Sequence, residues 1–554
     1  MDRPSGTGTP PPPDDPTLTF NRPRAGGFRA PPPSYDPPLD PMGDIGRVVG
    51  GLALLVIPVA ALVLAYVLPT FRTIQLSRIE HFGVLGTSNE VGTANYAELF
   101  ADGTFAGGLA QLAGPIAVTV LIGSILAPLL AWLLHRSGAR VRALSRIVWS
   151  LAAITFVPTA LTVAWLVDRV VSESDREASV YDWIGLTAGV VLGIGVLVGL
   201  AVLRGGAETG TARSGVLTVA GLSAITLAAT GIQSFTYGSV SGLPPEAPTP
   251  VAQIRDELVG RVSAGAAAAT SVLLLAILAV LGLGAGFLFL ASRTRIDVTR
   301  GPADPAPARP AAAFLGLAVL VIVLAAVGYF LLPWLTRLGE GGVEEEGLWF
   351  LIRRTWGPPL VTTAVALPVA AIGGFAIGAL RPFGDASRWL LLLFAPWVFV
   401  GSGPLGVANL EAIAEEGEWM VIGSFPVRAW IAIPLLFLFA ALFWGLEDRR
   451  RTALREGTDP GEARRAFFAG AWPMLVLAAL VLLLVHAQDQ FWQQITWQDM
   501  FASGPMTWAL ENREFEDTGV GLGFPLPILA AYAVAAVAFA IWYLPKVAVK
   551  VGRD

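Results

Sequence analysis

The sequence predicts an all-α polytopic membrane protein with about twelve transmembrane helices, and three observations support this fold class. Hydrophobic residues make up 54% of the chain and charged residues only 14%. The mean hydropathy is +0.64, whereas a soluble domain carries about 25% charged residues. A helix needs about 20 apolar residues to cross a bilayer, and twelve stretches of roughly this length contain no Asp, Glu, Lys or Arg.

The uncharged stretches form two sets of six, separated by a Pro- and Arg-rich segment at residues 293–311 that we interpret as a cytoplasmic linker. We expect helices at residues 48–69, 112–134, 147–167, 183–203, 215–233 and 263–291, then at 312–335, 359–380, 389–408, 429–446, 466–485 and 525–544. Residues 47–292 and 312–554 are therefore predicted to be two six-helix halves. Because each half has an even number of crossings, the halves should be parallel, an arrangement that suits a translocation pathway between them.

The first 46 residues are rich in proline and poor in aliphatic side chains, which predicts a disordered tail. Lys and Arg are biased toward cytoplasmic loops, and most of the 37 basic residues lie on one side if the N-terminus is inside. This topology also places the clusters Arg136 to Arg146 and Arg449 to Arg451 on the same side. We expect a multi-pass protein of the cell membrane with both termini in the cytoplasm.

Several kinds of chemistry are excluded by the residues present. The chain has no cysteine and only three histidines, at positions 81, 135 and 486, so thiolate and His-cluster metal sites are not expected. Phosphate-binding loops and hydrolase motifs are absent too, so we expect neither an enzyme nor a cofactor. The uncharged stretches hold no carboxylate for ion coupling, which argues against a proton-driven carrier. His486 and Asp489, beyond the eleventh stretch, are interpreted as interfacial polar residues.

The order of short motifs resembles the paired permease subunits of sugar-type ABC importers, the maltose permease class, fused into one chain. In the first half the similar segments are NYAELFADGTF at 95–105, the helix at 142–167 with Pro158 in its middle, SFTYGSVSGLPPEAPTP at 234–250 and AGAAAATSVLLLAI at 264–277. In the second half they are residues 362–380, residues 472–497 and the C-terminal IWYLPKVAVKVGRD. The resemblance implies a type I importer fold with ATP hydrolysis on a separate subunit.

Permeases of this class carry a cytoplasmic loop, the EAA motif, that docks on the ATPase. Residues 451–473 stand where this loop is expected and match its pattern degenerately, at Arg451, Thr452, Ala453, Arg455, Gly457 and Pro473. An alternative interpretation of the segment is a basic helix beside the membrane that contacts anionic lipid. The equivalent first-half segment, residues 204–215, is too short for two helices, which predicts asymmetric docking.

Candidate gate or pathway positions are the proline kinks and residues near them, since proline frees backbone carbonyls inside a membrane helix. They are Pro158 in the first half, and Pro396, Trp397, Gly401 and Gly403 in the second. Simple helix bending is the competing explanation for each of them.

The leading hypothesis is the membrane-spanning component of an ABC importer that translocates a small solute, with carbohydrate as the expected class. Its expected partners are cytoplasmic ABC ATPase subunits, an extracytoplasmic solute-binding protein and the lipid bilayer, and no nucleic acid. The alternatives are a non-transporting permease-like scaffold or sensor, favoured by the degenerate loops, and a secondary carrier, disfavoured by the uncharged helices.

Overall fold

A computed structural model describes residues 43–80, 89–155, 180–235, 248–299, 309–336, 345–416, 430–495 and 526–552. Residues 44–554 form one compact unit, and the predicted tail at 1–46 lies almost wholly outside the described residues. In this unit, the described residues include eight helices that are long and apolar enough to cross a membrane. The predicted all-α polytopic membrane fold is thereby confirmed, while the number of twelve crossings stays a prediction.

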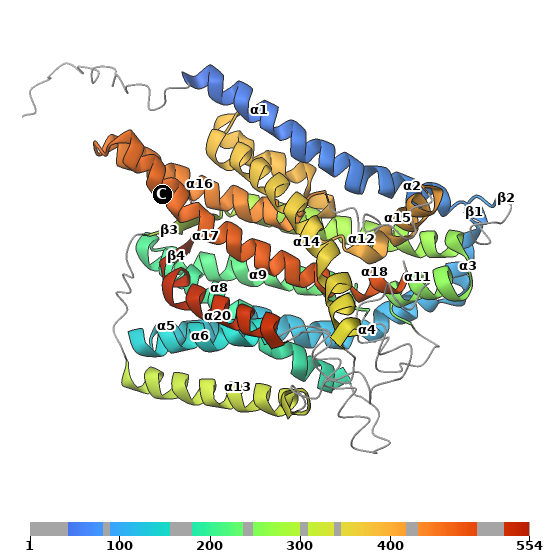
Figure 1. Cartoon of the computed structure of the whole chain (residues 1–554), viewed down its shortest axis with the longest axis horizontal. Coiled ribbons are helices and arrows are strands. Elements are labelled where there is room, and N and C mark those ends of the chain that lie inside the picture. Colours follow the sequence, from blue (N-terminus) through green and yellow to red (C-terminus); the bar gives the residue numbers. More distant parts are fainter. Residues whose placement is uncertain are drawn as a thin grey trace, which may run out of the picture. The chain divides into compact units, whose positions relative to one another are not determined.

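Residues 47–292, called the first half below, contain five of these eight helices (Figure 1). The elements are α1 (Gly43–Leu62), η1 (Val63–Val67), α2 (Leu68–Leu76), β1 (Ile79–Glu80), β2 (Asn89–Glu90), α3 (Ala94–Asp102), α4 (Thr104–Leu121), η2 (Ile122–Leu126), α5 (Ala127–His135), α6 (Ala139–Thr155), α8 (Val180–Thr209), α9 (Ala212–Gly231), α11 (Pro250–Arg255), η3 (Asp256–Gly260) and α12 (Ala264–Ala291). The π-helical turns η1 and η2 join their neighbours into continuous spans at 45–76 and 104–135.

Residues 312–554, called the second half, contain the other three of the eight. The elements after α12 are β3 (Arg295–Val298), α13 (Pro310–Thr336), α14 (Glu345–Phe375), η4 (Ala376–Leu380), η5 (Gly384–Leu393), η6 (Ala395–Trp397), α15 (Ser402–Glu416), α16 (Ile433–Arg455), α17 (Pro460–Ala487), α18 (Gln490–Ile495), α20 (Leu526–Trp542), η8 (Leu544–Lys546) and β4 (Val547–Lys550).

The expected helix at 389–408 is not one continuous α-helix. It is divided among the 3-10 segments η5 and η6 and the start of α15. Pro396 lies inside η6, where its ring removes a backbone donor, and residues 398–401 separate η6 from α15. The prediction of one helix at 389–408 was therefore wrong, since the regular α-helix begins only at Ser402.

The first helix of each half packs on the other half. Arg72 of α2 makes two hydrogen bonds to the carboxylate of Glu411 in α15, at 2.7 and 2.8 Å, and Pro58 of α1 packs against Gly373 of α14. Conversely, α13 is the first helix of the second half, and it packs against α5, α6 and α8 of the first half (Figure 1). Leu320 of α13 belongs to a buried cluster whose other buried members are first-half residues. The two halves are therefore interleaved.

The last helix of each half also packs on the other half, since α12 contacts η6 and α15 while α20 contacts α6. The segments after α12 and α20 meet as an antiparallel two-stranded ribbon, β3 with β4, in which Ile296 pairs with Val549. The linker predicted at 293–311 thus begins as a strand bonded to the C-terminal segment, and residues 300–308 lie outside the described part.

The ribbon lies between α8 and α16 and touches each of them at a glycine. A Cβ on Gly205 of α8 would come within 2.1 Å of the Val549 carbonyl oxygen, and one on Gly445 of α16 within 2.1 Å of the Ile296 carbonyl oxygen. These distances are below van der Waals contact, so both sites need glycine. The same helix-to-strand contact therefore occurs once in each half.

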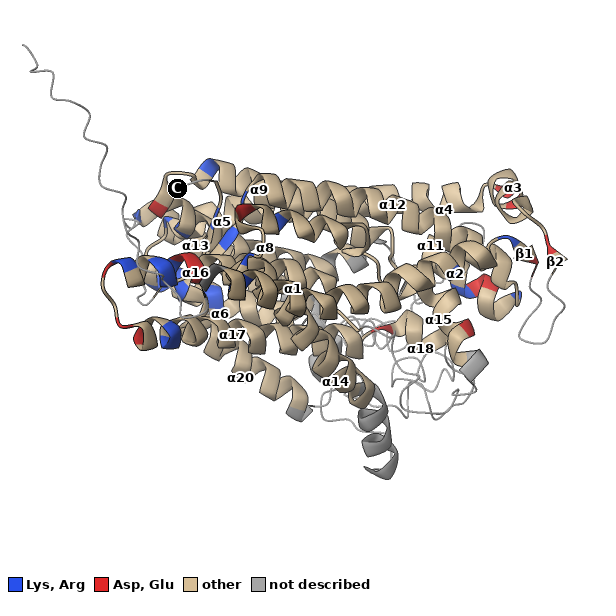
Figure 2. Ribbon diagram, turned by 90° about the horizontal axis from the view of Figure 1, so that it is seen from above, with Lys and Arg blue, Asp and Glu red and all other residues tan. Residues whose placement is uncertain are grey.

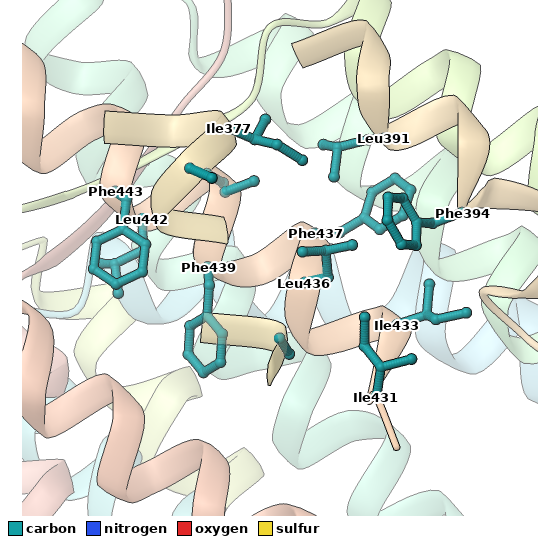
Figure 3. Close-up of a cluster of buried hydrophobic side chains, with 14 of the residues drawn as sticks. Ile377, Leu391, Phe394, Ile431, Ile433, Leu436, Phe437, Phe439, Leu442 and Phe443 are labelled. Carbon is teal, nitrogen blue, oxygen red and sulfur yellow. The ribbon is translucent and has the colours of Figure 1, made fainter. Parts of the chain in front are cut away.

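The largest buried cluster lies where α1, α14, α16 and η5 meet. Figure 3 shows its centre, in which phenylalanines of α16 pack against Ile377 and against Leu391 and Phe394. The cluster also includes Leu62 and Ala65 of the first half. This apolar packing fixes the polar groups at the two ends of the helices.

Candidate functional site

Lys and Arg residues gather at one end of the bundle, around α16 and near the C-terminus (Figure 2). We call this the basic end. Its centre is Glu447, whose side chain is 4% exposed. The Glu447 carboxylate accepts hydrogen bonds from Arg47 at 2.7 Å, from Arg450 at 2.7 Å and from Arg451 at 2.8 Å. Burial alone would raise the pKa of Glu447, but the hydrogen bonds from Arg450 and Arg451 outweigh it and lower this pKa.

A second set of ion pairs connects the ribbon to the helices. Lys550 of β4 binds Asp297 of β3 and Glu208 of α8, each at 3.0 Å. On the other side, Asp448 of α16 binds Arg381 at 2.7 Å and lies 3.8 Å from Arg295 of β3. The basic end is therefore a network in which the charges from both halves neutralise one another across the ribbon.

The residues predicted to couple to an ATPase lie in a helical hairpin at this end. Arg451, Thr452, Ala453 and Arg455 belong to the last turns of α16, and α17 begins at Pro460 with the Asp459 carboxylate capping it through a 3.0 Å bond from the Glu462 N–H. Gly457 has a φ of 84°, the left-handed conformation that closes the turn. The hairpin tip is exposed at Thr452, at Arg455 and at residues 456–457.

Pro473 is buried inside α17, away from the tip. The segment is thus a tight turn between two long helices rather than two separate short helices. Arg451 forms an ion pair with Glu447. In the first half, the corresponding turn is shorter still, because α8 ends at Thr209 and α9 begins at Ala212.

The predicted gate residues fall near the opposite end. Trp397 donates its indole N–H to the Thr70 hydroxyl at 3.1 Å, which connects η6 to α2. Pro396 lies beside it in η6. Gly401 and Gly403 lie farther along the chain and line a polar cavity, whereas Pro158 lies outside the described residues.

This cavity, called the seam cavity below, has a volume of about 260 Å³ and is bounded by four segments distant in sequence. Two segments come from the first half and two from the second. The lining residues are Gln233, Ser234, Phe235, Val251, Gly401, Ser402, Gly403, Gln488, Asp489, Gln490 and Phe491. Amides and hydroxyls dominate its polar lining, and Asp489 is its single charged side chain among the described residues.

Hydrogen bonds close the cavity between the two halves. The Gln233 side chain donates to the Phe399 carbonyl at 2.8 Å and accepts from the Gly401 N–H at 2.9 Å. Within the second half, Asp489 accepts from the Ser402 hydroxyl at 2.8 Å and from the Trp492 N–H at 3.1 Å. Asp489 is therefore not only an interfacial residue, because it also positions Ser402 at the cavity wall.

The two glycines allow this close approach. A Cβ on Gly403 would lie 2.8 Å from the Val251 side chain, and one on Gly401 would lie 3.1 Å from the Gln233 amide oxygen. Sequence reasoning found these glycines as a break in an apolar stretch but missed Gln488 and Gln490. The run of amides in QDQFWQQ at 488–494, directly after an apolar helix, was the available signal.

Gln488 and Gln490 are 8% and 5% exposed. Both atoms of each carboxamide, the nitrogen and the oxygen, lack a hydrogen-bond partner within the described protein. Buried amides normally have partners, so the cavity contrasts with the paired charges of the basic end. Comparison of the chain with known protein families, with curated proteins and with solved structures gave no match.

Proposed function

We propose that the chain is the membrane-spanning permease component of an ABC importer, which translocates a small carbohydrate using separate ATPase subunits. In this proposal, twelve helices form two parallel halves that rock against each other around the seam cavity. The basic end faces the cytoplasm and the ATPases, and the opposite end faces an extracytoplasmic solute-binding protein in the cell membrane.

The observation that carries the proposal is the matched packing of the two halves. Each half sends its first and last helices onto the other, and α8 and α16 each receive a strand carbonyl at a glycine, Gly205 and Gly445. The Ile296–Val549 pair stands midway between these two contacts. Such an arrangement supports an internal two-fold axis through the ribbon, about which two halves rotate as rigid bodies.

The exposed hairpin at the basic end supports an ATPase contact. Since α16 and α17 are rigid helices joined by a closed turn, a force on Arg455 or Gly457 would be transmitted directly into both spans. The ion pairs of Arg450 and Arg451 with the buried Glu447 stabilise the last turns of α16, at the base of this hairpin. The second half therefore offers the larger docking surface, which agrees with the asymmetry expected from the two loop lengths.

A secondary carrier is the second candidate, and Asp489 favours it. Ion-coupled carriers keep a carboxylate within the bundle, and Asp489 lines the seam cavity. Its carboxylate already accepts two hydrogen bonds, from the Ser402 hydroxyl and the Trp492 N–H, so its contacts in the fold position Ser402 and the start of α18. We therefore propose the importer ahead of the carrier.

Co-purification tests the proposal. The chain is expressed in its own host with an affinity tag, extracted in detergent and assayed for a bound polypeptide that hydrolyses ATP. We expect a stoichiometric ATPase with the wild type and its loss with Arg455→Glu, which reverses a charge at the exposed hairpin tip. Gly457→Pro should act in the same way, because proline cannot adopt the φ of 84° found there.

Arg78→Glu is the matched control, since Arg78 is exposed near the opposite end and in the described structure it has no ion-pair partner. This variant should retain the ATPase. Wild-type chain that never brings an ATPase with it, yet transports solute in response to an ion gradient, would replace the importer with the carrier.

A further inference from the structure

The unpartnered amides of the seam cavity are its most informative feature. Gln488 and Gln490 leave two donor nitrogens and two acceptor oxygens buried without a partner, at the wall of a space of about 260 Å³. Leaving buried polar groups unpaired lowers the stability of a fold. Residues that destabilise the chain in this way are typical of sites where a ligand completes the hydrogen bonding.

The chemistry of these groups selects the ligand. A carboxamide presents a donor and an acceptor side by side, so a ligand that carries both kinds of group satisfies it best. A metal cation would bind the two oxygens and leave both nitrogens unpaired. An anion would satisfy the nitrogens but would lie in the same cavity as the Asp489 carboxylate.

Hydroxyl groups meet both requirements, because each donates one hydrogen bond and accepts others. The apolar part of the wall includes Phe235 and Phe491, whose ring centroids lie 5.4 Å apart in an edge-to-face arrangement. Such rings suit the C–H faces of a saturated ring or chain. Ligand pockets have volumes of about 300–1,000 Å³, so a cavity near 260 Å³ fits a small solute.

We propose that the seam cavity is a binding site for one small, neutral, polyhydroxylated solute, held by the carboxamides of Gln488 and Gln490. The proposal rests on the transport function above and assigns its solute-holding residues. Because the cavity wall includes Gln233 and Gly401, whose hydrogen bond joins the two halves, movement of the halves opens and closes the site. The solute is therefore enclosed at the end opposite the hairpin.

The test combines binding and stability in one set of variants. Purified full-length chain in lipid nanodiscs is titrated with glucose, sorbitol and trehalose, and with gluconate and glucosamine as charged comparators. Binding is followed by tryptophan fluorescence, since buried Trp492 adjoins the cavity residue Phe491. We expect saturable binding of at least one neutral compound and at least tenfold weaker binding of both charged ones.

The double variant Gln488→Met and Gln490→Met keeps the side-chain length but removes the polar atoms. We expect at least tenfold weaker binding together with a higher Tm of the unliganded chain, because unpaired buried groups are removed. A purely structural role for the amides would lower the Tm. Gln493→Met is the control, since its amide nitrogen bonds the Ala487 carbonyl at 3.4 Å and it does not line the cavity.

Two results would overturn the site assignment: no binding of any neutral compound up to its solubility limit, or a lower Tm in the double variant with unchanged binding. Either result leaves ATPase co-purification intact and so does not touch the importer function. Conversely, saturable binding without any associated ATPase would keep the site and remove the importer.

Discussion

The two ends of the helix bundle treat polar groups in opposite ways. At the basic end, Glu447 is nearly inaccessible and three arginines bind it, while Lys550 binds two carboxylates. In the seam cavity, Gln488 and Gln490 are equally buried and their amides have no partner. The ion pairs of the basic end hold helices and strands together. The unpaired amides of the seam cavity lower the stability of the fold, which is why we assign them to a ligand.

Removing the carboxylate at the basic end should give the largest effect. Glu447→Gln removes the charge of the carboxylate that three arginines share, and breaking a buried ion pair costs about 3–5 kcal/mol. Arg47, Arg450 and Arg451 keep 15 to 27% of their side chains exposed, so we expect the low end, about 3 kcal/mol. The measurement is the thermal unfolding midpoint in detergent.

Glu456→Gln is the matched control for this prediction. Glu456 is exposed at the hairpin turn, nine residues along the chain, and its substitution should change stability by less than about 0.5 kcal/mol. Equal losses of stability from the two substitutions would mean that the buried ion pairs of Glu447 contribute no more than an exposed glutamate does.

The ribbon contacts should give the next largest effect. Gly445→Ala places a Cβ within 2.1 Å of the Ile296 carbonyl oxygen, and backbone on both sides limits relaxation, so we expect a loss of about 2 kcal/mol. Gly205→Ala should behave alike because the first half repeats the contact. Gly284→Ala, with no atom within 4 Å of its Cβ, is the control, and unequal losses at positions 205 and 445 would contradict the matched packing.

The same contrast shows how much the sequence could predict. The helical spans follow from uncharged stretches, because the requirement for apolar length is local. The glycine at 457 indicates a turn, and Pro396 with Gly401 and Gly403 indicates a kink. The sequence nevertheless predicts one helix at 389–408, because apolar composition does not show that the regular α-helix begins only at Ser402.

Long-range pairings could not be predicted. The strand at 295–298 was interpreted as linker and the one at 547–550 as a basic terminus, and only the fold brings them together. The seam cavity likewise draws its wall from four separate segments. Gln488 and Gln490 looked like ordinary polar residues after a helix, because sequence does not reveal that both are buried without partners.

Acidification should destabilise the fold through Glu447 at the basic end. The pKa of Glu447 is lowered in the fold, so the unfolded chain binds a proton more readily than the folded chain. Its stabilising contribution is therefore fully present above the ordinary glutamate pKa of 4.5 and is lost as the pH falls through the lowered value. Tm measured over this acidic range should fall more steeply for the wild type than for Glu447→Gln, and parallel curves would contradict the assignment.

A disulfide across the ribbon tests the arrangement of the halves through crosslinking rather than through a change in stability. The chain has no cysteine, so Ile296→Cys with Val549→Cys introduces a single pair into a clean background. Paired residues in antiparallel strands have Cα atoms about 4.5–5.5 Å apart, within the range for a disulfide of about 4.4–6.8 Å. Mild oxidation should therefore crosslink the linker to the C-terminal strand. After a protease cut between the halves, the crosslinked chain should run as one band under non-reducing conditions.

Ile296→Cys with Ala548→Cys is the control, because neighbouring side chains on a strand point to opposite faces. Efficient crosslinking of the control but not of the register pair would mean that β3 and β4 pair in another register, and the proposed axis through Ile296 and Val549 would then be wrong.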